Sequence, residues 1–204
     1  MLHFTGKGLN VQKVRLALFR LARLAYETFY ESINFDKMTI LYERHIVLIA
    51  PEIHWNTGNI GRSCLGTGAY LHLIKPLGFS LDSREVKRAG LDYWGRVKLK
   101  LWDDFKVFYE SMKIHKDEAA LFTKTGRHLF WELPHPKRLF LIFGSETKGM
   151  PDPIRKLFGE DSTYHIPIRN DIRSLNLSTS VGIGLYESLR HVPLFHGWLK
   201  KIIL

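Results

Sequence analysis

The sequence contains a single cysteine, Cys64, among its 204 residues. One thiol excludes a disulfide within the chain and a metal site built from cysteines alone. Such low cysteine use is typical of a reducing compartment, and we expect a cytoplasmic protein. No apolar run approaches the roughly 18 to 20 residues that span a bilayer, and no secretory signal pattern opens the sequence, so we expect no membrane partner.

Common catalytic signatures are also missing. The sequence has no GxSxG nucleophile elbow, no HExxH zinc motif and no CxxC pair. Its ten histidines do not show metal-ligand spacing, and carboxylates paired for hydrolysis are not evident. We therefore expect no metal, and a chemistry that depends on positioning the reactants rather than on a metal or a nucleophile.

Acidic residues are few relative to basic ones, which gives a formal net charge of +10. A basic surface favours a polyanionic partner, with nucleic acid ahead of a membrane surface. A solvated face or a basic proteome would give the same balance, so charge alone does not decide the partner.

From residue 44 onward, apolar runs alternate with amphipathic segments. The runs predict strands at 45–50, 71–74, 97–101, 119–123, 139–143 and 164–166, and the segments between them predict helices at 60–68, 82–89, 103–114, 151–158 and 177–190. This order predicts an α/β fold with a doubly wound, mainly parallel sheet. Ligands of such sheets bind at the carboxyl ends of the strands.

The two ends of the chain differ from this core. Residues 11–33 read as a basic amphipathic helix. The chain is therefore expected to consist of an N-terminal extension (1–37), one main domain with the alternating pattern (38–192) and a tail (193–204). Three interpretations of the extension compete: an accessory helix, an organelle transit peptide, and an over-extended start with Met38 as the true beginning. Two acidic residues late in the segment argue against the transit peptide.

Three polar segments follow strands and precede helices, at 56–62, 143–151 and 166–178. In the first, Arg62 is expected in the first turn of a helix, where a guanidinium suits a phosphate or another planar anion. Taken alone, that segment is better explained as a capped helix with a solvated arginine. In the second, Gly144 permits close approach of a ligand, and Glu146 offers an acceptor.

Taken together and in this order, the segments resemble the SPOUT superfamily of RNA methyltransferases. Within it they are most similar to the small tRNA (cytidine/uridine-2'-O-)methyltransferases of the TrmL (YibK) type. The resemblance covers about residues 38–191 and is carried by NTGNIGR at 56–62, RAGLDY at 88–93, FGSETKGMP at 143–151, IPI at 166–168, RSLNLS at 173–178 and YE at 186–187.

The resemblance implies a C-terminal trefoil knot, S-adenosylmethionine held by the knot loops, a tRNA substrate, and a homodimer with the site near its interface. The implied cofactor contacts are Phe122, Gly144, Ile166 and Ser174, with Glu146 and Asn176 as supports. The implied substrate contacts are Asn56, Arg88 and Tyr93.

The implied reaction is 2'-O-methylation of ribose, at the first anticodon nucleotide, with another tRNA site or rRNA as alternatives. A non-catalytic RNA-binding or assembly factor of the same fold is the rival outside the enzyme class. Arg62 and Arg173 are the implied catalytic residues, the latter acting in the same pocket or from the facing subunit. Because a guanidinium is a poor base, we expect Arg62 to bind phosphate and stabilise negative charge on oxygen. We expect Tyr186 to be structural, in the dimer interface.

The sequence departs from the family at His54 and Trp55, where small residues or proline are usual. Trp55 either stacks on a nucleobase or fills an edge of the core. A second aromatic and basic region, Tyr93-Trp94-Gly95 with Arg84, Lys87 and Arg88, is expected to face tRNA.

Overall fold

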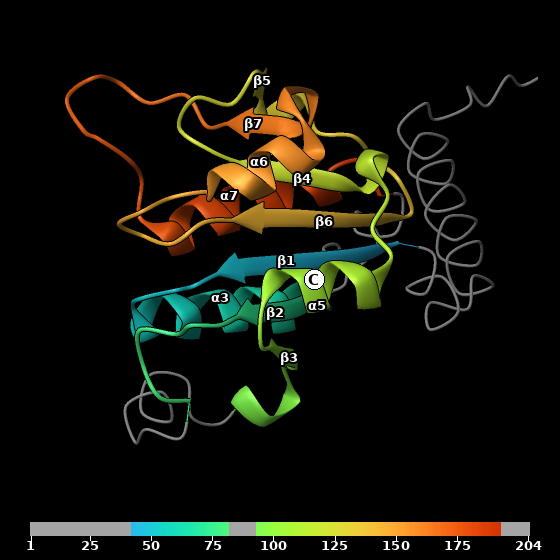
Figure 1. The fold of residues 1–204 in the computed structure, drawn as a ribbon, viewed down its shortest axis with the longest axis vertical. Coiled ribbons are helices and arrows are strands. Elements are labelled where there is room, and N and C mark those ends of the chain that lie inside the picture. The colour runs from blue at the N-terminus through green and yellow to red at the C-terminus, as the bar shows by residue number, and fades with distance from the viewer. Residues whose placement is uncertain (1–41, 82–92, 193–204) are drawn as a thin grey trace, which may run out of the picture.

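The computed structural model describes residues 42–81 and 93–192 (Figure 1). Seven strands form one sheet: β1 (Glu43–Ile49), β2 (Tyr70–Ile74), β3 (Lys98–Trp102), β4 (Ala119–Phe122), β5 (His128–Leu129), β6 (Arg138–Phe143) and β7 (Thr163–His165). Four α-helices accompany them: α3 (His54–Thr67), α5 (Phe105–Met112), α6 (Asp152–Phe158) and α7 (Leu177–Leu189). Short 3₁₀ turns are η2 (Trp94–Arg96), η3 (Lys116–Glu118), η4 (Phe130–Glu132) and η5 (Glu160–Ser162).

The sheet has the order β3-β2-β1-β6-β4-β7-β5, and every pairing between neighbouring strands is parallel. Parallel strands need crossover connections, which cover both faces of a sheet and bury its centre. Accordingly, β1 and β6 are buried along nearly their whole length. The predicted α/β fold with a parallel sheet is confirmed.

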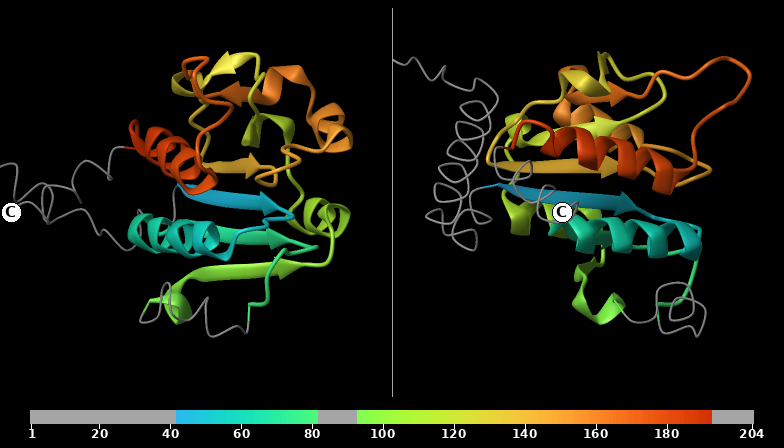
Figure 2. Two further views of the ribbon diagram at one scale, coloured as in Figure 1. Left: turned by 90° about the vertical axis from the view of Figure 1, so that its left-hand side faces the viewer. Right: turned by 180° about the vertical axis from the view of Figure 1, so that it is seen from behind.

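Alternate side chains of each central strand enter two separate cores. Ile46 and Leu48 of β1 pack with α3 and α7, whereas Val47 and Ile49 pack with α5 and α6. The ribbon shows α3 and α7 together on one side of the sheet, with α5 and α6 on the other (Figure 2). Because all the strands are parallel, the loops that follow β1, β2, β4, β6 and β7 leave the sheet at the same end, where the carboxyl ends of the strands lie. We call this end the carboxyl edge.

The predicted strands and most of the predicted helices lie within a few residues of the observed ones. Two differences are larger. Helix α3 begins at His54 rather than at residue 60, so Asn56 lies inside its first turn and Arg62 in its third, not in the first as expected. The reason is that an acceptor distant in sequence, described below, caps this helix. The two-residue strand β5 was not predicted, because it pairs only with β7 and has no apolar run of its own.

Several predictions fall outside the described residues. They are the helix at 11–33, the helix at 82–89, the tail 193–204, and with them the division of the chain into three parts. Arg84, Lys87 and Arg88 also lie there.

A chain of hydrogen bonds crosses β3, β2 and β1 beneath α5. The indole nitrogen of Trp102 can only donate, so Nδ1 of His72 accepts from it at 3.0 Å. Nε2 of His72 must then donate to Nδ1 of His45 at 2.9 Å, and Nε2 of His45 to Glu43 at 3.4 Å. Both imidazoles are thereby fixed in their neutral form. Burial, reinforced by nearby charges, lowers the pKa of His45 to about 4 and that of His72 to about 3.

This arrangement predicts a loss of stability in mild acid. Below about pH 6.5 the unfolded chain binds protons on these histidines that the folded chain cannot accept, so the free energy of unfolding falls as the pH drops. We expect urea denaturation to show a loss on the order of 2 kcal/mol or more between pH 7.5 and pH 5. A His45→Phe/His72→Phe variant should lose much of this pH dependence. An unchanged slope in that variant would contradict the assignment, and His115→Gln, at an exposed position, is the control.

Candidate active site

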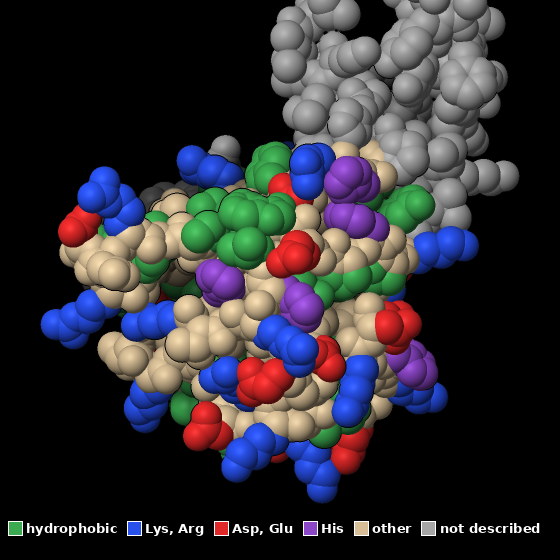
Figure 3. All heavy atoms as spheres, turned by 90° about the horizontal axis from the view of Figure 1, so that it is seen from above, with side chains coloured by type: hydrophobic (Ala, Val, Ile, Leu, Met, Phe, Trp, Pro, Cys, Tyr) green, Lys and Arg blue, Asp and Glu red, His purple; other side chains and the backbone are tan. Residues whose placement is uncertain are grey.

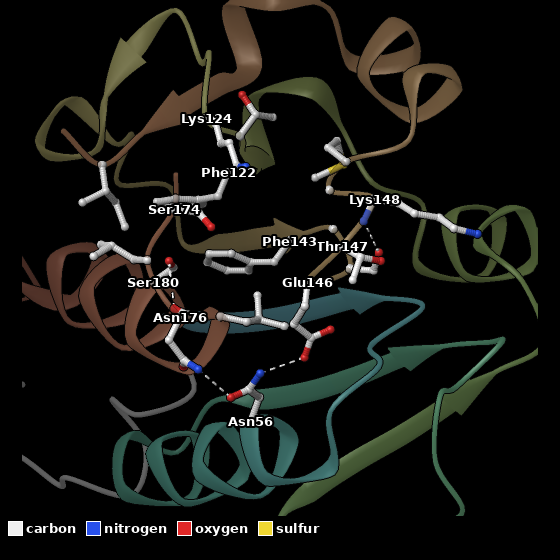
Figure 4. Close-up of a pocket in the computed structure, with 18 of the residues that line it drawn as sticks. Asn56, Phe122, Lys124, Phe143, Glu146, Thr147, Lys148, Ser174, Asn176 and Ser180 are labelled. Atoms are coloured by element: carbon white, nitrogen blue, oxygen red, sulfur yellow. Dashed lines mark hydrogen bonds between the residues drawn. The ribbon is translucent and has the colours of Figure 1, made fainter. Parts of the chain in front are cut away.

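A cavity of about 610 Å³ lies at the carboxyl edge, between the loops that follow β4, β6 and β7 and the starts of α3 and α7 (Figure 4). Its size is within the roughly 300–1,000 Å³ range of small-molecule sites. All six residues that the resemblance assigned to the cofactor line it: Phe122, Gly144, Glu146, Ile166, Ser174 and Asn176. They belong to the ends of β4, β6 and β7, to the loops that follow these strands, and to the start of α7. This is where the rule that ligands bind at the carboxyl ends of parallel strands predicts a site.

Two aromatic rings form the floor of this cavity. Phe122 and Phe143, at the ends of β4 and β6, stack with their ring centroids 4.6 Å apart. Gly184 of α7 lies directly against the Phe122 ring, and a methyl group at Gly184 would stand 2.7 Å from it. Both rings are buried, so the Phe122 side chain is tied to the core.

The loop after β6 folds back on itself. Ser145 and Gly149 form an antiparallel bridge, and the Lys148 amide donates to the Ser145 hydroxyl at 3.2 Å. Gly144 lies so close to the backbone of Gly149 that any side chain at position 144 would collide with it. Gly144 is therefore required for the shape of the loop, independently of any ligand.

Three side chains form a polar clamp, defined as Glu146, Asn56 and Asn176 (Figure 4). Nδ2 of Asn56 donates to Oε1 of Glu146 at 2.8 Å, and Nδ2 of Asn176 donates to Oδ1 of Asn56 at 2.9 Å. Oδ1 of Asn176 in turn accepts from the Ser178 amide at 2.9 Å, which caps α7. The clamp thus joins the three polar segments that the sequence analysis singled out.

Glu146 also caps α3. Its carboxylate accepts from the backbone amides of Glu52, at 2.8 Å, and Ile53, at 3.2 Å. Free amides at a helix start favour a negative charge, so this carboxylate takes the place of a local capping residue. The residue before the helix is the apolar Ile53, so no local capping residue indicated a helix start at His54.

Asn56, predicted to bind substrate, is 5% exposed, and both ends of its amide are engaged within the clamp. It lines the cavity, yet these bonds position the two helices and the loop relative to one another. Its contact with substrate stays a prediction.

The cavity lining includes residues that the sequence analysis did not select: Thr123, Lys124, Thr125, Lys148 and Arg155. The first three directly follow β4, so the strand-end rule could have found them. Nothing local indicated Arg155, whose guanidinium makes two bonds to Glu160 and one to the Thr125 hydroxyl at 3.2 Å. The hydroxyl of Thr123 has no hydrogen-bond partner within the described residues.

Basic side chains are not confined to the cavity. The view onto the β5–β7 side of the molecule shows lysines and arginines around much of its outline, with acidic residues interspersed (Figure 3). The cavity lining itself has three basic residues against one acidic residue. The site is therefore mildly electropositive rather than a concentrated anion trap.

Neither predicted catalytic arginine lines the cavity. Arg62 is exposed on α3, and its guanidinium carbon lies 4.9 Å from the ring centroid of Tyr93. Tyr93 is buried and donates its hydroxyl to the Gly58 carbonyl at 3.0 Å, so this predicted substrate contact anchors its segment to α3. Arg173 is exposed in the loop before α7, and Tyr186 is 48% exposed on α7.

Among residues 42–81 and 93–192, no group of three histidine, cysteine or carboxylate side chains is placed to hold a metal ion, and no helix is both long and apolar enough to cross a bilayer. Burial raises the pKa of the Cys64 thiol to about 12, which makes it a poor nucleophile.

Comparison with solved structures defines the class of protein first. A structure described as "Structural insights into the 2-OH methylation of C/U34 on tRNA" is 39% identical, covers 74% of this chain and 97% of its own, and superposes with a TM-score of 0.65. The architecture is therefore that of an RNA methyltransferase.

The chain belongs to the SpoU rRNA methylase family, whose model matches residues 43–186. A relative from Listeria monocytogenes is 48% identical over 149 residues, 72% of this chain and 86% of the relative. The tRNA (cytidine(34)-2'-O)-methyltransferase of Yersinia pestis is 40% identical over 160 residues, 77% of this chain and 99% of that enzyme. The resemblance inferred from the sequence motifs is confirmed.

The clamp makes a prediction about stability. Glu146→Ala leaves two helix-start amides and the Asn56 amide without their acceptor, so we expect the free energy of unfolding to fall by about 2–4 kcal/mol in urea denaturation. Asp161→Ala removes an exposed ion pair with Arg127 and should cost less than about 1 kcal/mol. Equal losses in the two variants would show that Glu146 has no special structural role.

Proposed function

We propose that this protein transfers a methyl group from S-adenosylmethionine to a ribose 2'-hydroxyl of tRNA, at the cytidine or uridine in the first anticodon position, and that it does so in the cytoplasm. The observation that carries the proposal is the convergence of Gly144, Ile166 and Ser174 in one cavity at the carboxyl edge. The named activity of relatives that match 72% or more of this chain supports the choice of reaction and substrate.

The lining residues fit such a cofactor. Apolar side chains at Phe143, Ile166 and Leu175 suit the faces of an adenine ring, while the Ser174 hydroxyl suits a polar group. When bound, S-adenosylmethionine supplies a methyl group that is already activated by its sulfonium. The protein's contribution is then to hold the ribose oxygen in line with that group and to exclude competing water.

In this proposal Arg62 binds the phosphate next to the target ribose and stabilises negative charge that develops on the 2'-oxygen. Its stacking on Tyr93 limits the positions that the guanidinium can take. Arg173 acts at the same place, from the loop that leads into α7.

A homodimer is part of the proposal, because Arg62 and Arg173 lie outside the cavity of their own chain. A second copy packed over the exposed Tyr186 of α7 would bring further arginines toward the cavity. The trefoil knot is proposed as well. It is supported by the path of the chain. The chain forms β7 next to the outermost strand β5 and then returns to the centre of the sheet, where α7 packs against β1, β6 and α3.

The cofactor pocket can be tested with a steric block. Ser174→Trp places a large side chain in the cavity and should weaken S-adenosylmethionine binding at least 100-fold, as measured by calorimetry. Asp117→Trp, at an exposed site before β4 and thus at the opposite edge of the sheet, is the matched control. Unchanged binding by Ser174→Trp would refute the pocket assignment.

The reaction is tested by methylation of unmodified tRNA with nucleoside mass spectrometry. Arg62→Ala should lower kcat/KM by roughly 100-fold or more, since removal of one charge-stabilising donor typically costs that much. Cofactor affinity should stay unchanged, because in this proposal Arg62 contacts the RNA phosphate and not the cofactor.

The alternatives give different outcomes in the same assay. A 2'-O-methyl mark at the first anticodon nucleotide supports the proposal. Transfer only to another tRNA site or to rRNA would refute the proposed target nucleotide and support the proposed reaction. Cofactor binding without transfer to any RNA would refute the reaction, and absence of both would favour a non-catalytic RNA-binding factor.

A further inference from the structure

Trp55 is the largest side chain exposed beside the cavity. It lies in the first turn of α3, with 52% of its surface exposed. Ile53 and Asn56, on either side of it in the chain, both line the cavity, while Trp55 does not. Trp55 therefore lies in the turn of α3 that adjoins the cavity, and the exposure of its indole favours stacking on a base over a place at the edge of the core.

The indole is the first of three aromatic rings that extend away from the cavity. The ring of His54 lies 4.7 Å from that of Trp55 and 6.4 Å from that of Phe79, centroid to centroid. Phe79 belongs to the loop after β2, where it lines a second, open cavity together with Leu77, Leu81 and Leu101. Ring contacts thus connect the start of α3 with the apolar lining of this second cavity.

We propose that the exposed face of Trp55 stacks on an unpaired nucleobase of the RNA substrate, next to the nucleotide whose ribose enters the cavity. This inference rests on the proposed function, since it takes the cavity as the methyl-transfer site. Single-stranded RNA loops are recognised mainly by stacking of splayed bases on aromatic side chains, which needs only a free π-face.

The position of Trp55 is fixed relative to the cavity by the clamp. Glu146 lines the cavity and also accepts the two backbone amides that immediately precede α3. The helix start that carries the indole and the cavity wall are therefore held by one carboxylate. A base on Trp55 would in this way set the distance of its neighbouring ribose from the cofactor.

The charges nearby favour a base over a phosphate at this point. Glu52, three residues before Trp55, has its pKa lowered chiefly by a hydrogen bond from the Thr147 hydroxyl, which donates at 2.6 Å. It stays ionised and would repel a phosphate there. The overall charge of +10 attracts RNA to the protein as a whole, so the indole is left to position one base.

The test uses the full-length protein, a tRNA transcript, and the variants Trp55→Ala, Trp55→Phe and Trp131→Ala. Trp131 is a matched control, because it is 46% exposed in η4 and lines neither cavity. Trp55→Ala should raise KM and Kd for the RNA roughly 5- to 100-fold, as expected for the loss of one base stack, and leave the Kd for S-adenosylmethionine unchanged. Trp55→Phe should retain most of the affinity, and Trp131→Ala all of it.

Stacking itself is measured with RNAs that have an abasic nucleotide on either side of the target. For one of them, Trp55→Ala should cause no further loss of affinity, since the base that stacks is already gone. Unchanged RNA affinity in Trp55→Ala, or full additivity with both abasic RNAs, would overturn the proposal. So would a change of oligomeric state in light scattering, which would show that a second copy covers the indole.

Failure of the proposed function has a separate signature. If wild-type protein transfers no methyl group but its RNA affinity still depends on Trp55 and on one base, the stacking stands and the reaction does not. If methyl transfer proceeds with the same KM in Trp55→Ala, the reaction stands and the stacking is refuted.

Discussion

Helix α3 depends on a carboxylate that lies 90 residues beyond its own Asn56 in the sequence. Glu146 accepts the amides that precede the helix and also holds Asn56, which in turn is held by Asn176 at the start of α7. These are charge-assisted or doubly bonded contacts in a partly buried place, where loss of one partner leaves the others unsatisfied. The carboxyl ends of β1 and β6 and the start of α7 are thus fixed together, and they form one wall of the cavity.

Most strands and helices could be predicted from the sequence, because burial in the core imposes a recognisable pattern of apolar residues. The buried runs of β1 and β6 could be read as strands from their length and β-branching, and Pro151 and Asn176 mark the starts of α6 and α7 locally. The start of α3 could not be read, because its cap is supplied through tertiary structure rather than by a neighbouring residue. The order of the strands in the sheet could not be predicted either, because it is set by the crossover connections and not by the composition of any one strand.

The candidate site divides in the same way. The strand-end rule and the family motifs brought together six residues that do line one cavity. The same reasoning selected Asn56 as a substrate contact and placed Arg62 in the first turn of its helix. It could not show the contacts that these residues make with distant segments: Glu146 and Asn176 occupy the Asn56 amide, and the Tyr93 ring lies against the Arg62 guanidinium. A local pattern shows which groups are available, whereas tertiary packing decides which of them remain free.

Three residues of the proposed site share one helix. Trp55, Asn56 and Arg62 all belong to α3, and six residues along a helix correspond to roughly 9 Å. Gly61 has no room for a side chain because Trp94 packs against it, and this contact holds the Tyr93 segment beside Arg62. The exposed indole, the cavity wall and the guanidinium are therefore parts of one rigid element that is capped at the cavity and packed at its third turn. A substrate long enough to touch all three must match that fixed distance, and a flexible single-stranded loop of nucleic acid can do so by adjusting its own backbone.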